Sequence, residues 1–69
     1  MSDKVYKKID VVGTSSMNLE DAIQKAVTKS AATVRNMNWF EVDEIRGRIE
    51  GDAVTQWQVT VRIGFAVEE

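Results

Sequence analysis

The sequence predicts an α+β fold, a β-α-β-β subunit in which a three-stranded antiparallel sheet packs on one amphipathic helix. Residues 4–12 and 53–67 alternate apolar and polar side chains, which is typical of half-buried strands. Residues 19–37 instead repeat apolar side chains at the i, i+3, i+4 spacing of a helix. Residues 38–50 alternate again, with one slip, and predict the remaining strand.

The length of 69 residues indicates a single domain, residues 1–69. A domain of this size buries only about 60% of the surface that its unfolded chain exposes, so it is marginally stable alone. The sequence contains no cysteine and no histidine, which excludes disulfides and the usual ligands of a zinc site. We therefore expect the chain to be stabilised by self-association.

The charged residues are interspersed, with 9 basic and 11 acidic side chains and a net charge of −2. This balance argues against a nucleic-acid partner. No apolar run approaches the roughly 20 residues that span a bilayer, and the first residues lack the apolar segment of a signal peptide. We expect a soluble, cytoplasmic protein without a membrane partner.

The first strand is expected over residues 4–12. Val5, Ile9 and Val11 define its core face, while Tyr6 and Val12 lie on the opposite side. The Gly-Thr-Ser-Ser run at residues 13–16 is expected to end the strand.

The helix is expected to begin after Asn18, a good N-cap, with Glu20 and Asp21 near the positive end of the helix dipole. Its apolar repeat continues to Met37, which predicts about five turns. The Gly-Thr-Ser run before it is also compatible with a phosphate-binding turn. Without a full glycine pattern or a lysine in that run, capping is the favoured interpretation.

The strand at residues 38–50 organises the rest of the chain. Its apolar positions move from even numbers, Phe40 and Val42, to odd numbers, Ile45 and Ile49. One extra residue near positions 43–44, a β-bulge, restores the same two faces and bends the strand. Four side chains then point away from the core: Trp39, Glu41, Arg46 and Arg48.

The register of the following hairpin can be predicted because paired residues share a face. A two-residue loop would mix the faces, so we expect a three-residue loop, residues 51–53. Beyond the loop the predicted pairs are Glu50 with Val54, Arg48 with Gln56, Arg46 with Gln58, Ile45 with Val59, Val42 with Val61, Glu41 with Arg62, Phe40 with Ile63 and Trp39 with Gly64.

The face that carries Trp39 has no other segment of this chain to cover it. An indole there either packs in a subunit contact or stacks on a flat aromatic ligand, and the pattern alone favours subunit packing. Gln58 offers a donor and an acceptor to a ring edge, and Arg46 offers a cation to a phosphate. Because Trp39 and Gln58 lie about 20 Å apart along the strand, a shared site has to form between subunits unless the bend of the strand brings the two together.

Catalytic residues are not indicated by the sequence. Histidine and cysteine are absent, and the carboxylates Glu41, Asp43, Glu44 and Glu50 balance nearby arginines rather than suggesting an acid-base pair. We therefore expect a binding protein and not an enzyme.

Several short motifs resemble the dodecins, small flavin-binding proteins. They are Val12-Gly13-Thr14-Ser15, Trp39-Phe40-Glu41-Val42, Ile45-Arg46-Gly47, Gln58-Val59 and Gly64-Phe65, in the order and spacing of that family. The resemblance covers essentially the whole chain. It implies a β-α-β-β subunit assembled as a hollow homododecamer, with flavins at the subunit interfaces.

The resemblance also implies a function and its residues. Trp39 would stack on the isoalloxazine ring of FMN or riboflavin, Gln58 would bond its polar edge, and Arg46 would contact a phosphate. Similar bacterial dodecins carry an arginine where this chain has Ala66, which bears on the choice between FMN and riboflavin. Some dodecins also bind coenzyme A, although no motif here assigns residues to it.

Two functions therefore follow from the sequence. The first is flavin storage with suppression of flavin photochemistry. The alternative is a structural oligomeric interaction module in which Trp39 is a subunit-packing anchor.

Overall fold

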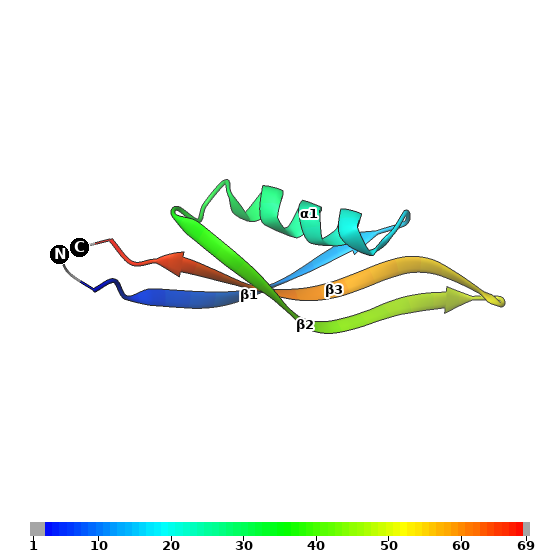
Figure 1. Ribbon diagram of the computed structural model, residues 1–69. Helices are drawn as coiled ribbons and strands as arrows, with labels where there is room; N and C mark the ends of the chain where they lie inside the picture. The colour runs from blue at the N-terminus through cyan, green and yellow to red at the C-terminus, as the bar shows by residue number, and fades with distance from the viewer. Residues whose placement is uncertain (1–2, 69) are drawn as a thin grey trace.

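The predicted order of elements is confirmed in the computed structural model, which describes residues 3–68. The elements are β1 (Tyr6–Ser15), α1 (Leu19–Ser30), β2 (Met37–Glu50) and β3 (Ala53–Ala66). The strands form one antiparallel sheet in the order β1-β3-β2, and α1 lies on one face of it (Figure 1). The predicted α+β fold is thus confirmed, with β3 as the central strand.

The core lies between α1 and the middle of β3. Ala22 and Ala26 of the helix meet Val59, Val61 and Ile63 of the strand, and all five are buried. Small alanine side chains let the sheet approach the helix axis closely. Among the described residues, α1 contacts β1 and β3 but not β2.

The first strand is longer than predicted. It starts at Tyr6 and continues through the Gly-Thr-Ser run to Ser15, where the sequence suggested a turn. Gly13 is buried under α1, and a Cβ there would collide with the carbonyl oxygen of Ala22. The glycine therefore serves close packing of strand and helix, not a change of direction.

The start of α1 agrees with the prediction. The Asn18 side chain accepts a hydrogen bond from the backbone N–H of Asp21 at 2.8 Å, as an N-cap should. The buried Ser15 hydroxyl donates to Asp21 Oδ2 at 2.6 Å and accepts from the backbone N–H of Met17 at 2.9 Å. These bonds join the end of β1 to the first turn of α1.

The predicted five-turn helix is wrong, because α1 ends at Ser30. Tighter turns follow, in which the N–H groups of Ala32 and Thr33 bond to carbonyls three residues earlier, at 3.3 and 3.1 Å. Asn36 then takes the left-handed conformation, φ 63°, and reverses the chain into β2. The apolar repeat ran past the helix because Met37, already in β2, also packs on the core.

The predicted bulge in β2 is confirmed. The register shifts between Val42 and Glu44, so that Asp43 is the extra residue. On either side of it the predicted pairs are observed, including Trp39 with Gly64, Glu41 with Arg62 and Arg46 with Gln58. A further shift between Met37 and Trp39, at the start of the strand, was not predicted.

The predicted three-residue loop is wrong. Gly51 and Asp52 alone connect the strands, and Glu50 pairs with Ala53 instead of Val54. Gly51 has a φ of 63°, which suits a tight hairpin turn. The faces still agree because the register shifts again near the hairpin end, pairing Ile49 with Val54 and Arg48 with Gln56, so Thr55 is an extra residue.

Apart from Met37, the apolar side chains of β2 are not in the core of this chain, contrary to the alternation argument. Phe40, Val42, Ile45 and Ile49 face the same side as α1, yet they are 49%, 42%, 53% and 71% exposed. The helix is too short and too far toward β1 to cover them. We call Phe40, Val42, Ile45, Ile49 and Val54 the apolar row.

Candidate functional site

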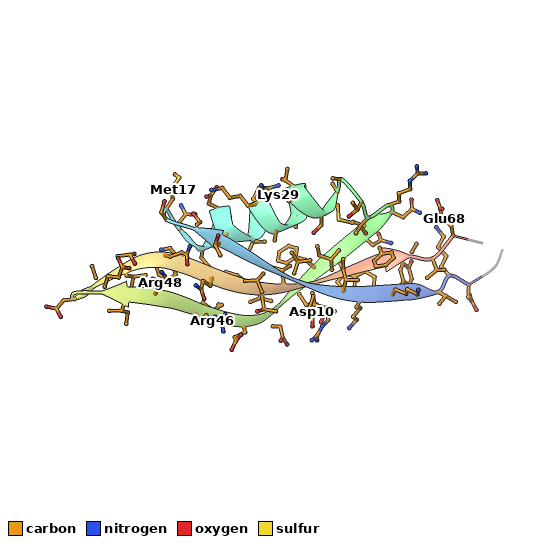
Figure 2. All side chains as sticks on the ribbon, turned by 180° about the vertical axis from the view of Figure 1, so that it is seen from behind. Asp10, Met17, Lys29, Arg46, Arg48 and Glu68 are labelled. Carbon is orange, nitrogen blue, oxygen red and sulfur yellow. The ribbon has the colours of Figure 1, made fainter. Side chains whose placement is uncertain are left out.

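The three predicted site residues lie on the outer face of the sheet, the face turned away from α1. Trp39 and Arg46 of β2 pair with Gly64 and Gln58 of β3. Paired residues share a face, and these even-numbered positions of β3 face away from α1. Figure 2 shows Arg46, together with Asp10, on the side of the sheet remote from the helix. One face therefore carries every residue that the sequence analysis assigned to a ligand.

The indole of Trp39 lies directly across Gly64. A Cβ at position 64 would overlap three atoms of the six-membered ring, so only glycine permits this placement. The Tyr6 ring stands edge-on to the indole, with centroids 5.2 Å apart and an interplanar angle of 65°. Trp39 nevertheless remains 38% exposed, so part of the ring is open to a partner or a ligand.

A carboxylate fixes the polar edge of the same ring. Trp39 Nε1 donates to Glu41 Oε2 at 2.9 Å, and Lys8 Nζ lies 3.0 Å from that same oxygen. The hydrogen bond from Trp39, followed by Lys8, lowers the pKa of Glu41. Sequence reasoning missed this contact. Glu41 was visible two residues after Trp39 on the same face, but Lys8 could be placed only with the register of β1.

Arg46 and Gln58 are brought together by the β2–β3 pairing. Arg46 Nε donates to Gln58 Oε1 at 2.7 Å, and Gln58 Nε2 donates to Gln56 Oε1 at 2.8 Å. The amide of Gln58 is therefore oriented by its neighbours, with its oxygen toward the guanidinium. Arg46 keeps the two terminal nitrogens of its fork for other acceptors.

Trp39 does not lie beside Arg46 and Gln58 in the same chain. It sits opposite Gly64, six residues along β3 from Gln58, which is about 20 Å of extended strand. Arg62 lies between them and is held by Asp10 at 2.9 Å and by the bulge residue Asp43 at 3.5 Å. The two carboxylates, Asp10 first, raise the pKa of Arg62. In one chain, the predicted site residues are thus separated into two groups by an ion-pair cluster.

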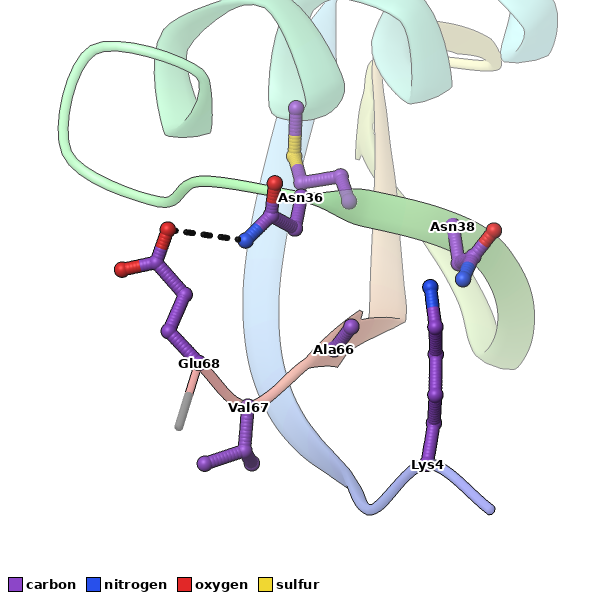
Figure 3. Close-up of a pocket in the computed structure, with 7 residues that line it drawn as sticks. Lys4, Asn36, Asn38, Ala66, Val67 and Glu68 are labelled. Carbon is purple, nitrogen blue, oxygen red and sulfur yellow. Dashed lines mark hydrogen bonds between the residues drawn. The ribbon is translucent and has the colours of Figure 1, made fainter. Parts of the chain in front are cut away.

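A hollow of about 460 Å³ opens at the end of the sheet beside Ala66. Figure 3 shows the side chains of Lys4, Asn38, Asn36 and Glu68 around it, with a hydrogen bond of 3.3 Å from Asn36 to Glu68. The small side chain of Ala66 contributes to this open space, and Lys4 places one cation in its wall.

Other kinds of site receive no support from the described part of the chain. Within residues 3–68, histidine, cysteine, aspartate and glutamate side chains form no group of three or more that could hold a metal ion. No helix in that range is long and apolar enough to cross a membrane.

Comparison with known proteins identifies the family. The dodecin family profile matches residues 5–68, nearly the whole chain. The chain belongs to the dodecin family. The sequence resemblance to dodecins is thereby confirmed.

Individual dodecins are similar to this chain both in sequence and in structure. A dodecin from Thermus thermophilus is 50% identical over 66 residues, which is 96% of both chains. Dodecin structures from Streptomyces davaonensis and Streptomyces coelicolor superpose with a TM-score of 0.93, at 37% and 43% identity, and cover 99% and 100% of this chain and 100% and 99% of theirs. These relatives are bacterial, and their likeness extends over the full subunit.

Proposed function

We propose that this protein binds a flavin, FMN or riboflavin, between subunits, and that it stores the cofactor and quenches its photochemistry. The observation that carries the proposal is the indole of Trp39, laid across Gly64 on the outer face and 38% exposed. An indole that lies against the backbone of Gly64 and is partly exposed is suited to stacking against a planar ring. Family membership supports the same ligand.

Gln58 and Arg46 supply the polar half of the proposed site. The Gln58 amide, oriented by Arg46 and Gln56, offers a donor and an acceptor to the ring edge of the flavin. The remaining guanidinium nitrogens of Arg46 can bind a phosphate. Because Trp39 and Gln58 are about 20 Å apart in one chain, each flavin takes these groups from different subunits.

Self-assembly, which the family suggests is a homododecamer, is supported by the apolar row. Its five side chains, Phe40, Val42, Ile45, Ile49 and Val54, are 42–71% exposed along one side of β2 and the end of β3. A hollow of about 230 Å³, lined in part by Val27, Phe40 and Ile63, continues this surface toward α1. Contiguous exposed apolar surface of this kind is typical of subunit interfaces.

Ala66 bears on which flavin is bound. Among variants of the Thermus thermophilus dodecin, one with alanine in place of an arginine matches this chain at 51% identity. A second arginine-to-alanine variant and a tryptophan-to-phenylalanine variant match at 48%. The unsubstituted Thermus thermophilus structure matches at 49% over the same share of its chain as the first variant, which is the difference expected if that substitution falls at the position of Ala66. Lys4, in the hollow beside Ala66, is the cation available there for FMN.

The proposed photochemical role follows from the stacking contact. An excited flavin is a strong oxidant, and an adjacent indole is an electron donor, so the excited state is quenched without a chemical product. We propose no catalytic turnover. Freshly purified protein should be yellow and weakly fluorescent, and heating should release a fluorescent flavin that chromatography identifies. Colourless protein that fails to quench added FMN and riboflavin would contradict the proposal.

Replacing Trp39 by alanine tests the role of the indole. Trp39→Ala should weaken flavin binding by about 1–3 kcal/mol, by analogy with bases stacked on aromatic side chains. The matched control is Trp57→Phe, since Trp57 pairs with Gly47 and Ser15 on the helix side of the sheet. A fluorescence titration with both flavins should separate the two variants. Equal affinity in Trp39→Ala and the parent would refute the stacking role.

The alternative function is a structural interaction module in which Trp39 anchors subunits. The observation that favours this alternative is the 38% exposure of Trp39 on the outer face, because an exposed aromatic side chain is also suited to packing against a second subunit. In that case Trp39→Ala should break the assembly, seen by sedimentation, while the parent binds no flavin. Coenzyme A is a further ligand suggested by the family, and calorimetric titration of the parent tests it.

A further inference from the structure

Glu41 connects the outer strands of the sheet through one oxygen atom. Its Oε2 accepts the indole N–H of Trp39, two residues earlier on β2, and lies 3.0 Å from Lys8 Nζ of β1. The two strands are separated by β3, where Gly64 stands between Lys8 and Trp39 in the register. Because Gly64 has no side chain, none stands between the lysine and the indole at this position of the sheet.

The indole is thereby constrained on three sides. Gly64 lies beneath the ring, the Tyr6 ring is steeply inclined to it with centroids 5.2 Å apart, and Glu41 accepts the hydrogen bond of Nε1. Of these, Gly64 and Tyr6 limit where the ring can go by contact alone. Glu41 adds a directional bond to these contacts, so it restricts the rotation of the ring about its χ angles further than contact alone does.

We propose that Glu41, braced by Lys8, is a positioning residue that sets the orientation of Trp39 and so prepares a stacking surface before any ligand arrives. We call Glu41 and Lys8 the indole clamp. The part of this inference that concerns affinity rests on the proposed flavin binding. The part that concerns the orientation of Trp39 does not.

Preorganisation determines the expected effect on affinity. A side chain already held in its bound conformation loses less freedom when a ligand stacks on it, which is worth about a 2- to 10-fold difference in affinity for one residue. The loss in clamp variants should therefore be smaller than the loss in Trp39→Ala, which removes the stacking surface itself.

The clamp should respond to acid. Glu41 faces the indole of Trp39 on its own strand, Lys8 from β1 and Arg62 from β3. The pKa of Glu41 is lowered, first by the bond from Trp39 and then by Lys8. The clamp is therefore complete above the ordinary pKa of a glutamate and is lost as the pH falls through the lowered value.

Fluorescence anisotropy of Trp39 in the ligand-free protein is the direct test. Trp57→Phe leaves Trp39 as the only tryptophan of the two in the chain, and excitation at wavelengths that tyrosine does not absorb keeps Tyr6 out of the signal. In this background Glu41→Ala should lower the anisotropy and raise quenching by acrylamide, and Lys8→Met should do so to a smaller extent. Glu41→Gln, which keeps an acceptor oxygen, should retain most of the anisotropy and lose its decrease in acid.

Asp10→Asn is the matched control. It removes a paired carboxylate from the same face, but Asp10 bonds to Arg62 and not to the indole. Its Trp39 anisotropy should equal that of the parent. Flavin affinity is measured on the same proteins, and Glu41→Ala should bind about 2- to 10-fold more weakly.

The outcomes separate the clamp from the proposed function. Unchanged anisotropy in both Glu41→Ala and Lys8→Met would overturn the clamp, whether or not flavin binds. If Glu41→Ala does not fold, Lys8→Met and the acid profile of Glu41→Gln decide the question alone. Parent protein that binds no flavin but shows the predicted anisotropy changes would refute the proposed function and leave the clamp established.

Discussion

Two neighbouring strands carry similar apolar side chains on the same face of the sheet and bury them very differently. Val59 and Val61 of β3 are 0% exposed, whereas their partners across the ladder, Ile45 and Val42 of β2, are 53% and 42% exposed. The cause is α1, which has 12 residues and packs on β1 and β3 only. Apolar alternation therefore identifies a face to be buried, but it does not say which chain buries it.

The difference divides the subunit into two halves. In the buried half the chain covers its own apolar side chains, and in the exposed half it does not. The first half is α1 with β1 and the middle of β3. The second is β2, which carries Trp39 and Arg46 on one side and most of the apolar row on the other. Substitutions in the two halves should thus differ in how their effects depend on protein concentration.

The largest effect is expected in the buried half. Ile63 is 1% exposed, so Ile63→Ala should lower the free energy of unfolding by about 2–5 kcal/mol. Ile49→Ala, at a 71% exposed site, is the matched substitution in β2. Its smaller effect should shrink as the protein is diluted, because it acts through assembly and the parent also loses its assembly at low concentration. Denaturant unfolding at two protein concentrations measures both. Equal losses at both positions would contradict the division.

A charge in the apolar row should break the assembly. Ile45→Glu places a carboxylate where we propose that another subunit packs, and burying an unpaired charge costs several kcal/mol. Sedimentation should show a smaller species than the parent. Gln24→Glu, on an exposed position of α1, introduces the same charge as a control. If Ile45→Glu sediments like the parent, the apolar row is not a subunit contact.

Gly64 tests how closely the outer face of β2 depends on β3. Gly64→Ala would place a methyl group against the ring of Trp39 and turn the indole away from its position. Forcing a side chain off its rotamer costs about 0.5–1.5 kcal/mol, so we expect a loss of flavin affinity of that order. Flavin titration measures it. Unchanged affinity would mean that the ring does not need to lie across position 64.

The smallest effect concerns acid stability of the buried half. A hydrogen bond from Ser15, and then Lys25, lowers the pKa of Asp21. A carboxyl whose pKa is lowered by folding stabilises the protein above its unfolded pKa, and this contribution is lost as the pH falls through the folded value. Asp21→Asn should therefore flatten the decline of stability in acid, measured by urea unfolding across that range. An unchanged slope would exclude Asp21 as a contributor.

Much of the fold could be predicted because side-chain parity is strict in a strand. The slip between Val42 and Ile45 was sufficient to locate the bulge, and the bulge with the hairpin gave the pairs from Trp39–Gly64 to Arg48–Gln56. The turn itself was wrong, because an extra residue in β3 has the same effect on parity as a longer loop. The helix was overestimated because apolar spacing alone cannot distinguish a helical residue from one that reaches the core after the helix has ended.

The site was predicted as a set of residues on one face, and their roles in ligand binding stay predictions. What the sequence could not supply was the register of β1. Without that register, Lys8 and Tyr6 could not be placed beside Trp39. Glu41 was therefore interpreted only as the cross-strand partner of Arg62. The contacts that orient the indole come from three strands, and their separation in sequence hides them.

The bulge at Asp43 also limits how this strand can change in length. Trp39 and Arg46 are an odd number of positions apart, yet they share a face because the extra residue reverses the parity between them. A single-residue deletion at Asp43, or a single insertion between the two, would turn one of them toward the helix side. Insertions and deletions that preserve the outer face must therefore come in pairs of residues.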